Sequence, residues 1–408
     1  MSFQQGLSGL NAASKQLEVI GNNVSNANTV GFKQSRAEFA DVFANSLNGT
    51  GTSQIGIGTK INAVAQQFTQ GNITGTNNSL DIAINGGGFF RMSNNGAVTY
   101  SRNGQFQLDK FGYIVDSESK RLTGYAADAS GSLLTGAPAD LNINTADLQP
   151  SSTTNVTGVV NLDSRNTALT AAGFDPTDPA TYHNSTAVTV YDSLGNPHTL
   201  QSFFVKTGPG VWDVFNTANG VSTTTLPTPT ATLTFSGTGI TPTSVPATPT
   251  VSFPVTTGAS SPLATVLDYS GSTQFGASFS INSLKQDGFT SGRLASFNTS
   301  GDGTIVGRYT NGQSKTLGRV TLVSFVNPNG LQSLGGNAWT ESADSGPPLL
   351  STPNTGLLGV LQSSAVEDSN VDLTAELVNM ITAQRVYQAN AQTIKTQDQV
   401  LQTLVNLR

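Results

Sequence analysis

The chain has 408 residues, of which 36% are hydrophobic and 11% are charged, and its formal net charge is −6. This length predicts two or three domains, and the negative charge, without any Lys/Arg cluster, argues against nucleic acid as a partner. The absence of cysteine excludes disulfides and thiolate metal sites, and no apolar run reaches about 18 residues, so we expect no membrane insertion. Low charge with 43 glycines is typical of β-rich extracellular structural proteins.

The first predicted element is a helix over residues 1–24. Its apolar residues follow a four-three spacing that Ser14 and Gly21 interrupt, and this heptad spacing is typical of a seam between helices. The apolar seam positions are Leu7, Leu10, Leu17 and Val24.

Between residues 25 and 70 the chain is rich in Asn, Gly and Gln, with a short apolar stretch at Phe39, Val42 and Phe43. We interpret this range as a connector with some extended structure. Strand patterns and tight turns begin near Asp81, and a comparable pattern returns after residue 284.

The returning pattern contains glycine turns at Gly301–Gly303 and Asn311–Gly312, which are typical of β-hairpins. Because the same pattern of strands and tight turns lies on both sides of a middle block, we predict one discontinuous β-domain made of residues 71–145 and 285–368.

The middle block, residues 146–284, is rich in Thr and Pro, as a linker would also be. However, Val188–Tyr191 and Leu200–Val205 flank a turn as the strands of a hairpin do, and Trp212–Phe215 could extend that hairpin. We therefore predict an outer β-domain inserted into the first one. The predicted fold class is mixed and mainly β, with paired terminal helices and two β-rich outer domains.

The last predicted element is a helix within residues 369–408. No Gly or Pro interrupts the chain from Asn370 onwards, and Ser369 followed by Asp372 resembles a capping box. The four-three spacing is occupied by Leu373, Leu377, Met380, Tyr387, Ile394, Leu401 and Val405. One face of an ordinary amphipathic helix would give the same spacing. Heptad spacing at both ends of the chain predicts a coiled-coil-like core domain, in which the two terminal helices pair with each other and with those of neighbouring copies.

Nothing in the sequence indicates catalysis. The two histidines, His183 and His198, stand in polar or turn contexts and are predicted to be surface residues rather than metal ligands. Gly86–Gly88 is followed by two phenylalanines rather than by Lys and Ser/Thr, unlike a phosphate-binding loop. The acidic residues are scattered without a pair suited to glycoside hydrolysis. We therefore expect no enzyme, no metal and no cofactor.

Residues 22–33 (NNVSNANTVGFK) and residues 376–394 closely resemble the two end signatures of the flagellar rod and hook axial-protein family. Residues 100–125 are similar to the shared β-domain of that family. The resemblance marks as signature positions Asn22, Asn23, Asn26, Gly31, Phe32, Gln384, Arg385, Gln388, Ala389 and Asn390.

Two further segments, Tyr191–Asn196 and residues 286–313, resemble hook subunits rather than distal rod subunits. Asp116–Lys120 departs from the family, because relatives often turn on a glycine there. A distal rod subunit stays an alternative, which the Tyr191 hairpin disfavours. A secreted β-rich adhesin or fibre is a further alternative, which the helical ends disfavour.

The resemblance implies a structural subunit of the hook, which assembles into a flexible helical tube outside the cell, as part of the basal body–hook structure. This tube would act as a universal joint that couples the rod to the filament. Export through the flagellar type III apparatus is also implied, and Met1–Leu10 lacks the pattern of a cleaved signal. The implied partners are copies of the chain, the distal rod protein, the hook cap protein, the hook–filament junction proteins and the export apparatus.

Overall fold

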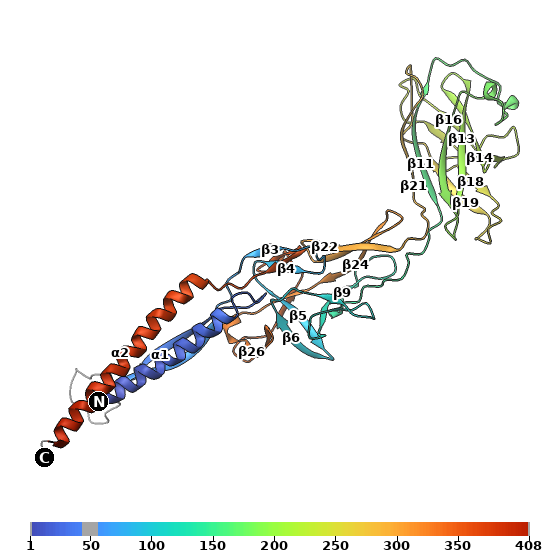
Figure 1. Ribbon diagram of the computed structural model, residues 1–408. Helices are drawn as coiled ribbons and strands as arrows, with labels where there is room; N and C mark the ends of the chain where they lie inside the picture. Colours follow the sequence, from blue (N-terminus) through green and yellow to red (C-terminus); the bar gives the residue numbers. More distant parts are fainter. Residues whose placement is uncertain (1, 43–55, 407–408) are drawn as a thin grey trace. The chain divides into compact units, whose positions relative to one another are not determined.

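The computed structural model describes residues 2–42 and 56–406 (Figure 1). Met1, Phe43 and the last two residues of the predicted C-terminal range lie outside the described residues. The chain forms two compact units, the first made of Met1–Asn144, Ser296–Gly307 and Ser314–Arg408, the second of Thr145–Ala295 and Arg308–Gln313. The predicted fold class is confirmed, since the chain is mainly β and its two terminal helices pack together. The predicted domain ranges stay a prediction.

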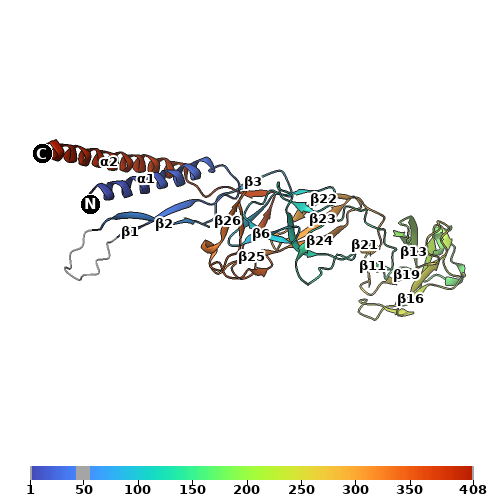
Figure 2. The ribbon, with the colours of Figure 1, turned by 90° about the horizontal axis from the view of Figure 1, so that it is seen from below.

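The terminal helices are α1 (Ser2–Ser25) and α2 (Leu373–Asn406), which lie side by side (Figures 1 and 2). The predicted capping box is wrong. Asp372 is the residue that caps α2, because its carboxylate accepts hydrogen bonds from the backbone N–H groups of Thr374 at 2.8 Å and Ala375 at 3.1 Å. The hydroxyl of Ser369 accepts only from the N–H of Val371, outside the helix.

A two-stranded ribbon follows α1, formed by β1 (Ser35–Val42) and β2 (Gly58–Gln66), which pair antiparallel. The ribbon runs along α1 (Figure 2). Ser8 of α1 accepts a hydrogen bond from the N–H of Thr59 at 3.3 Å, and the side chain of Gln5 donates to the carbonyl of Gly56 at 2.7 Å. The part of the connector that forms β1 and β2 is therefore extended and is also attached to the helix.

In the rest of the first unit, strands from before and after the second unit pair with each other. β25 pairs with β5, β27 with β6, and β24 with β9. The strands are β3 (Ile73–Gly75), β4 (Ile82–Asn85), β5 (Phe89–Asn94), β6 (Ala97–Ser101), β7 (Gln107–Leu108), β8 (Ile114–Val115), β9 (Arg121–Ala126), β10 (Ala139–Asp140), β24 (Ser314–Val320), β25 (Leu322–Ser324), β26 (Gln332–Gly335), β27 (Ala338–Thr340), β28 (Leu349–Ser351), β29 (Val360–Ser363) and β30 (Ala365–Glu367), with a 3-10 turn at Pro328–Gly330. β22 (Leu294–Thr299) and β23 (Thr304–Tyr309) carry the chain across the division between the units.

An aromatic cluster fills the core of the first unit. Phe89 meets Phe325 and Trp339 edge to face, with ring centroids 5.9 Å and 5.8 Å apart. The indole N–H of Trp339 donates a hydrogen bond to the side-chain carbonyl of Gln66, at the end of β2. The core therefore also anchors the ribbon that runs along α1.

The second unit consists of two sheets that share one apolar core. The order is β18-β19-β11-β20 in one sheet, with β21 beside β11, and β12-β13-β14-β16-β17 in the other. Val160, Phe204 and Trp212 are fully buried between them. The strands are β11 (Asn155–Asp163), β12 (Asn184–Tyr191), β13 (Pro197–Gly208), β14 (Val211–Ala218), β15 (Val221–Ser222), β16 (Ala231–Thr234), β17 (Thr243–Val245), β18 (Thr250–Phe253), β19 (Leu263–Asp268), β20 (Thr273–Phe275) and β21 (Ser280–Gln286), with 3-10 turns at Ala171–Gly173 and Pro179–Thr181.

The predicted hairpin is present as β12 and β13, paired from Asn184 with Phe204 to Tyr191 with Pro197, and β14 extends it. The Thr/Pro-rich tract forms strands β16 to β19 instead of a linker. The turn at Asp116–Lys120, where a glycine is missing, is made by Ser119 with a φ of 64°.

The prediction for His198 is wrong, because this residue is buried. One ring nitrogen lies 3.3 Å from the carboxylate of Asp192, and the other accepts from the side-chain amide of Asn219 at 3.0 Å. Hydrogen bonding satisfies both nitrogens, so a turn histidine is accommodated in the interior. His183 is half-buried, with a ring nitrogen 2.8 Å from the carbonyl of Thr167.

The segments that begin and end the second unit lie next to each other, joined by bridges between Leu148 and Gly292 and between Ser151 and Phe289. Asp287 also links these two segments, because its carboxylate accepts hydrogen bonds from the N–H and the hydroxyl of Thr154 at 2.8 Å and 2.6 Å.

We expect Asp287→Asn to weaken the acid sensitivity of the second unit. Burial alone would raise the pKa of the Asp287 carboxyl, but hydrogen bonds from Thr154 and Asn155 prevail and lower it from 3.8 to about 2. The resulting stability is complete above pH 3.8 and is lost as the pH falls through about 2. Allowing for solvent screening, it amounts to about 1 kcal/mol.

Chemical denaturation followed by circular dichroism at about pH 5 and about pH 2 measures this contribution. Asp344→Asn is the control, because its carboxylate is exposed and accepts no hydrogen bond within the part of the chain that the structure describes. An unchanged acid loss in Asp287→Asn would contradict the expectation.

Candidate assembly interface

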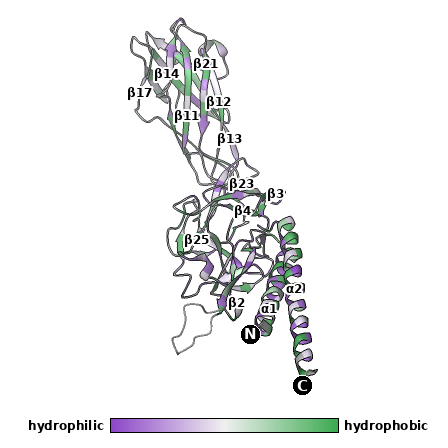
Figure 3. Cartoon of the chain, turned by 90° about the vertical axis from the view of Figure 1, so that its left-hand side faces the viewer, coloured by the Kyte–Doolittle hydropathy of each residue, from purple (hydrophilic) through white to green (hydrophobic). Residues whose placement is uncertain are grey.

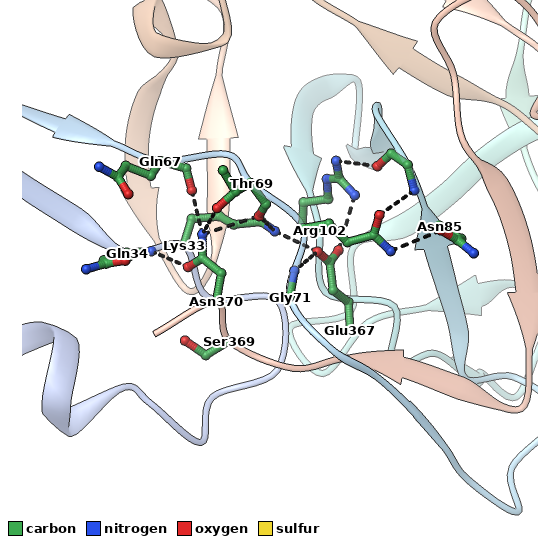
Figure 4. A network of polar contacts seen from close by, with 12 residues as sticks. Lys33, Gln34, Gln67, Thr69, Gly71, Asn85, Arg102, Glu367, Ser369 and Asn370 are labelled. Carbon is green, nitrogen blue, oxygen red and sulfur yellow. Dashed lines mark hydrogen bonds and ion pairs between the residues drawn. The ribbon is translucent and has the colours of Figure 1, made fainter. Parts of the chain in front are cut away.

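Three buried charged side chains join the two ends of the chain (Figure 4). Glu367, at the end of β30, accepts from the ammonium of Lys33 at 2.7 Å and from the guanidinium of Arg102 at 3.1 Å. The side chains of Lys33 and Glu367 have no exposed area. We call Lys33, Arg102 and Glu367 the charged junction.

Backbone groups complete the charged junction. Lys33 also donates to the carbonyl of Thr69 at 2.8 Å, Arg102 to that of Gly86 at 2.9 Å, and Glu367 accepts from the N–H of Gly71 at 3.0 Å. Burial lowers the pKa of Lys33 and of Arg102, and the Glu367 carboxylate opposes that change in both. Two cations share one carboxylate, so both depend on Glu367.

Gly31 allows the loop after α1 to reach this position. Its φ is 72°, and a Cβ there would lie 2.6 Å from the backbone nitrogen of Asn103. The N–H of Gly31 donates to the carbonyl of Glu367 at 2.8 Å. A side chain at Gly31 would therefore separate the loop from both Asn103 and Glu367.

Amide side chains fix the helix ends next to the charged junction. The side-chain amide of Asn23 forms two hydrogen bonds with the backbone of Ser35, as a neighbouring strand would. It donates to the carbonyl at 2.8 Å and accepts from the N–H at 2.9 Å. Asn370, before α2, accepts from the N–H of Gln34 at 2.7 Å and donates to the carbonyl of Gln67 at 2.8 Å. The end of α1 and the start of α2 are thus attached to the same ribbon.

The two helices meet through small side chains. A Cβ on Gly6 would lie 3.1 Å from the Ile394 side chain, and a Cβ on Gly9 would lie 2.8 Å from the Asn390 amide. Ala13 of α1 and Ala383 of α2 are almost completely buried. Residues without bulk let the helix axes approach closely.

The residues of α1 that are buried or that approach α2 are Gly6, Gly9, Ala13, Ile20 and Asn23. Each stands one residue before a position of the four-three spacing, but Leu17 has no such counterpart, since Gln16 is only half-buried. In α2, Glu376, Ala383 and Asn390 face α1, and Ile394 is the predicted position whose side chain approaches it.

The other predicted positions are not buried between the helices. Those that stay partly buried are Leu10, Leu17, Val24 and Met380. Those that are exposed are Leu7, Leu373, Leu377, Tyr387, Leu401 and Val405.

The signature positions separate into two groups. Asn22, Asn23, Asn26, Gly31 and Phe32 belong to the end of α1 and the loop behind it, where the carbonyl of Asn22 accepts from the side chain of Asn26 at 3.0 Å. On α2, Asn390 faces α1, whereas four positions are exposed: Gln384, Arg385, Gln388 and Ala389. Sequence reasoning gave no role to Glu367, which stands in no local pattern, or to Glu376, which opens the second signature segment.

No group of three His, Asp or Glu side chains that could hold a metal ion occurs within residues 2–42 and 56–406. In the same residues, no helix is long and apolar enough to cross a membrane.

Four family profiles match the chain. They are described as "Flagella basal body rod protein" for residues 3–33, "Flagellar hook protein FlgE/F/G D1 domain" for residues 83–162, "Flagellar basal body protein FlaE D2 domain" for residues 161–289 and "Flagellar basal body rod FlgEFG protein C-terminal" for residues 362–407.

Curated relatives match over the whole length. The chain is 42% identical to the flagellar hook protein FlgE of Salmonella typhimurium over 412 residues, with all of both chains covered. It is also 42% identical to that of Escherichia coli K12 over 416 residues, again with complete coverage. The FlgE of Borreliella burgdorferi is 32% identical over 445 residues, which cover 100% of this chain and 99% of that one.

Among solved structures, the hook protein FlgE2 of Helicobacter pylori superposes with a TM-score of 0.54 at 16% identity, covering 72% of this chain and 100% of that chain. This likeness supports the fold.

Glu367→Gln is expected to destabilise the first unit by about 3–5 kcal/mol, because it leaves two buried cations without a counter-charge. Denaturant unfolding measures the loss. Glu18→Gln is the matched control, since Glu18 pairs with Lys15 on the exposed surface, where such a pair is worth about 0–1 kcal/mol. Equal losses in both variants would show that the charged junction does not depend on Glu367.

Gly9→Val is expected to force the helices apart at a cost of about 1–3 kcal/mol, because its side chain would displace the Asn390 amide. Gly21→Val is the control, since a Cβ on Gly21 meets nothing within 4 Å. Hydrogen exchange of the α1 amides reports the difference. Equal protection in the two variants would argue against a close seam.

Proposed function

The chain belongs to the family of flagellar hook proteins, and we propose that copies of it polymerise into the flexible tube that couples the rod to the filament. Its role is structural rather than enzymatic, and its place is the hook, in the part of the flagellum outside the cell. The full-length match to hook proteins supports this assignment.

The observation that carries the proposal is the unpartnered surface of α2. Glu376 and Ala383 are buried, but large apolar side chains elsewhere on this 34-residue helix are exposed. Hydrophobic and hydrophilic residues alternate along α2 (Figure 3). These exposed side chains are Leu373, Leu377, Val378, Ile381, Val386, Tyr387, Val400, Leu401 and Val405. An exposed apolar surface of this kind is typical of an interaction site, and contacts with neighbouring copies would bury it.

We assign the predicted seam positions to contacts between copies. Within α1 the exposed Leu7, and within α2 the exposed Leu377 and Leu401, are apolar side chains that α1–α2 pairing does not use. The heptad spacing that the sequence shows would then describe packing in the polymer, while the small-residue seam describes packing within one subunit.

The finer partners follow from the place of a hook in the flagellum. We propose that the tube contacts the distal rod protein at one end and the hook–filament junction proteins at the other. We propose further that growth takes place under the hook cap protein, and that the chain travels through the flagellar type III export apparatus.

Leu377→Asp is expected to prevent hook assembly in a strain that lacks the chromosomal gene, because the charge would be buried between copies. Leu377 is exposed in the single chain, so the variant should still fold. Electron microscopy of the cells should show a rod without a hook or a filament.

Gln399→Asp places the same charge at another exposed position of α2 and serves as the control. It should allow assembly, with critical concentrations for polymerisation within about twofold of the unchanged chain. Normal hooks on cells that make only Leu377→Asp would refute the assignment of α2 to contacts between copies.

A further inference from the structure

A groove of ≈ 500 Å³ opens beside the start of α2, lined by α1, β1 and α2. Its lining includes the carboxylate of Glu376, which is 3% exposed. This carboxylate accepts from the side-chain amides of Gln34 at 2.8 Å and Asn23 at 3.3 Å. A more distant amide, Asn379, lies at 3.5 Å.

Glu376 has no cation within ion-pair distance in the described residues, which sets it apart from the buried Glu367. A buried carboxylate held only by amides remains costly, because neutral donors compensate little of its lost hydration. Arg36 also lines the groove, but its side chain is exposed and forms no ion pair with Glu376. Within the described residues, the amino-terminal end of α2 supplies only partial positive charge to this carboxylate, so the groove could still accept a full positive charge.

Arg385 is a cation that could pair with the carboxylate of Glu376. It is exposed, and within residues 2–42 and 56–406 it forms no ion pair and no side-chain hydrogen bond. Its guanidinium could bind a carboxylate through two parallel hydrogen bonds, which a lysine could not do.

Arg385 cannot reach Glu376 of its own chain. Successive residues of an α-helix turn by about 100° and rise by about 1.5 Å, so nine residues place Arg385 about 180° around α2 and about 13.5 Å further along it. The carboxylate and the guanidinium therefore leave opposite faces of one helix.

Two complementary groups on opposite faces are what a head-to-tail contact requires, because each copy offers one group and receives the other. Such contacts repeat without closing into a symmetric dimer, as a helical polymer needs. Resting on the proposed function, we propose that the guanidinium of Arg385 enters the groove of the neighbouring copy and pairs with its Glu376.

Other cations of the helical pair fit less well. Lys395 lies nineteen residues after Glu376, which turns it only about 100° from that carboxylate and places it about 28 Å further along. Lys15 already pairs with Glu18 at 2.8 Å. Among the cations of α1 and α2 that the structure describes, Arg385 is therefore the one best suited to pair with Glu376 of a neighbouring copy.

Crosslinking of two single-cysteine chains tests the contact. The native chain contains no cysteine, so only engineered thiols react. Asn379→Cys marks the groove, and Ala389→Cys marks the face of α2 that carries Arg385, one turn away. The two chains are mixed, polymerised and treated with a short bismaleimide. We expect a covalent dimer in the polymer and none in the monomer, and far less product when Gln399→Cys replaces Ala389→Cys.

Substitution of the cation provides the second measurement. Arg385→Gln should raise the critical concentration for polymerisation at least about thirtyfold, the lower range for truncating one member of a buried charge pair. Arg385→Lys should restore part of this loss, and Lys395→Gln should change the value less than about twofold.

The outcomes separate this inference from the proposed function. Failure of the unchanged chain to polymerise would overturn both. Polymerisation of Arg385→Gln at the unchanged concentration, without crosslinks between positions 379 and 389, would overturn the inference alone. A loss seen in Arg36→Gln but not in Arg385→Gln would identify Arg36 as the counter-ion and would also overturn the inference.

Discussion

The arrangement of the first unit depends on the carboxylate of Glu367. It meets Lys33 and Arg102, which lie 334 and 265 residues away along the chain. A buried ion cluster contributes little net stability, because the cost of desolvation offsets the attraction, but its geometry is specific. Lys33 follows α1 and Glu367 precedes α2, so this one carboxylate fixes the point from which both helices leave the β-structure.

From that point the helices run together on small residues. Gly6, Gly9 and Ala13 occupy the inner face of α1, and the large apolar side chains are left on its flanks. Packing within the subunit and packing between subunits thereby use different residues of the same two helices. On the proposed function, a subunit could then keep its own helix pair while contacts with its neighbours change during bending.

The sequence allowed the fold class, the two terminal helices and the β12–β13 hairpin to be predicted, because each has a local pattern. The residues on which the two helices meet within one subunit could not be predicted, since hydrophobic periodicity marks large apolar side chains and Gly6 and Gly9 carry none. Glu367 could not be identified at all, because its partners are distant in sequence and no spacing connects them. His198 was placed at the surface because its hydrogen-bond partner Asn219 belongs to a different turn.

The chain has two tryptophans, and one lies in the core of each unit. Trp212 is fully buried between the two sheets of the second unit. Trp339 packs on Phe89 and donates a hydrogen bond to the side chain of Gln66, at the end of β2. Replacing either residue with phenylalanine leaves a single tryptophan, which can be excited at wavelengths that the tyrosines do not absorb. The emission of Trp212 alone would then report the second unit, and that of Trp339 alone would report the first unit with its helices, without any added dye.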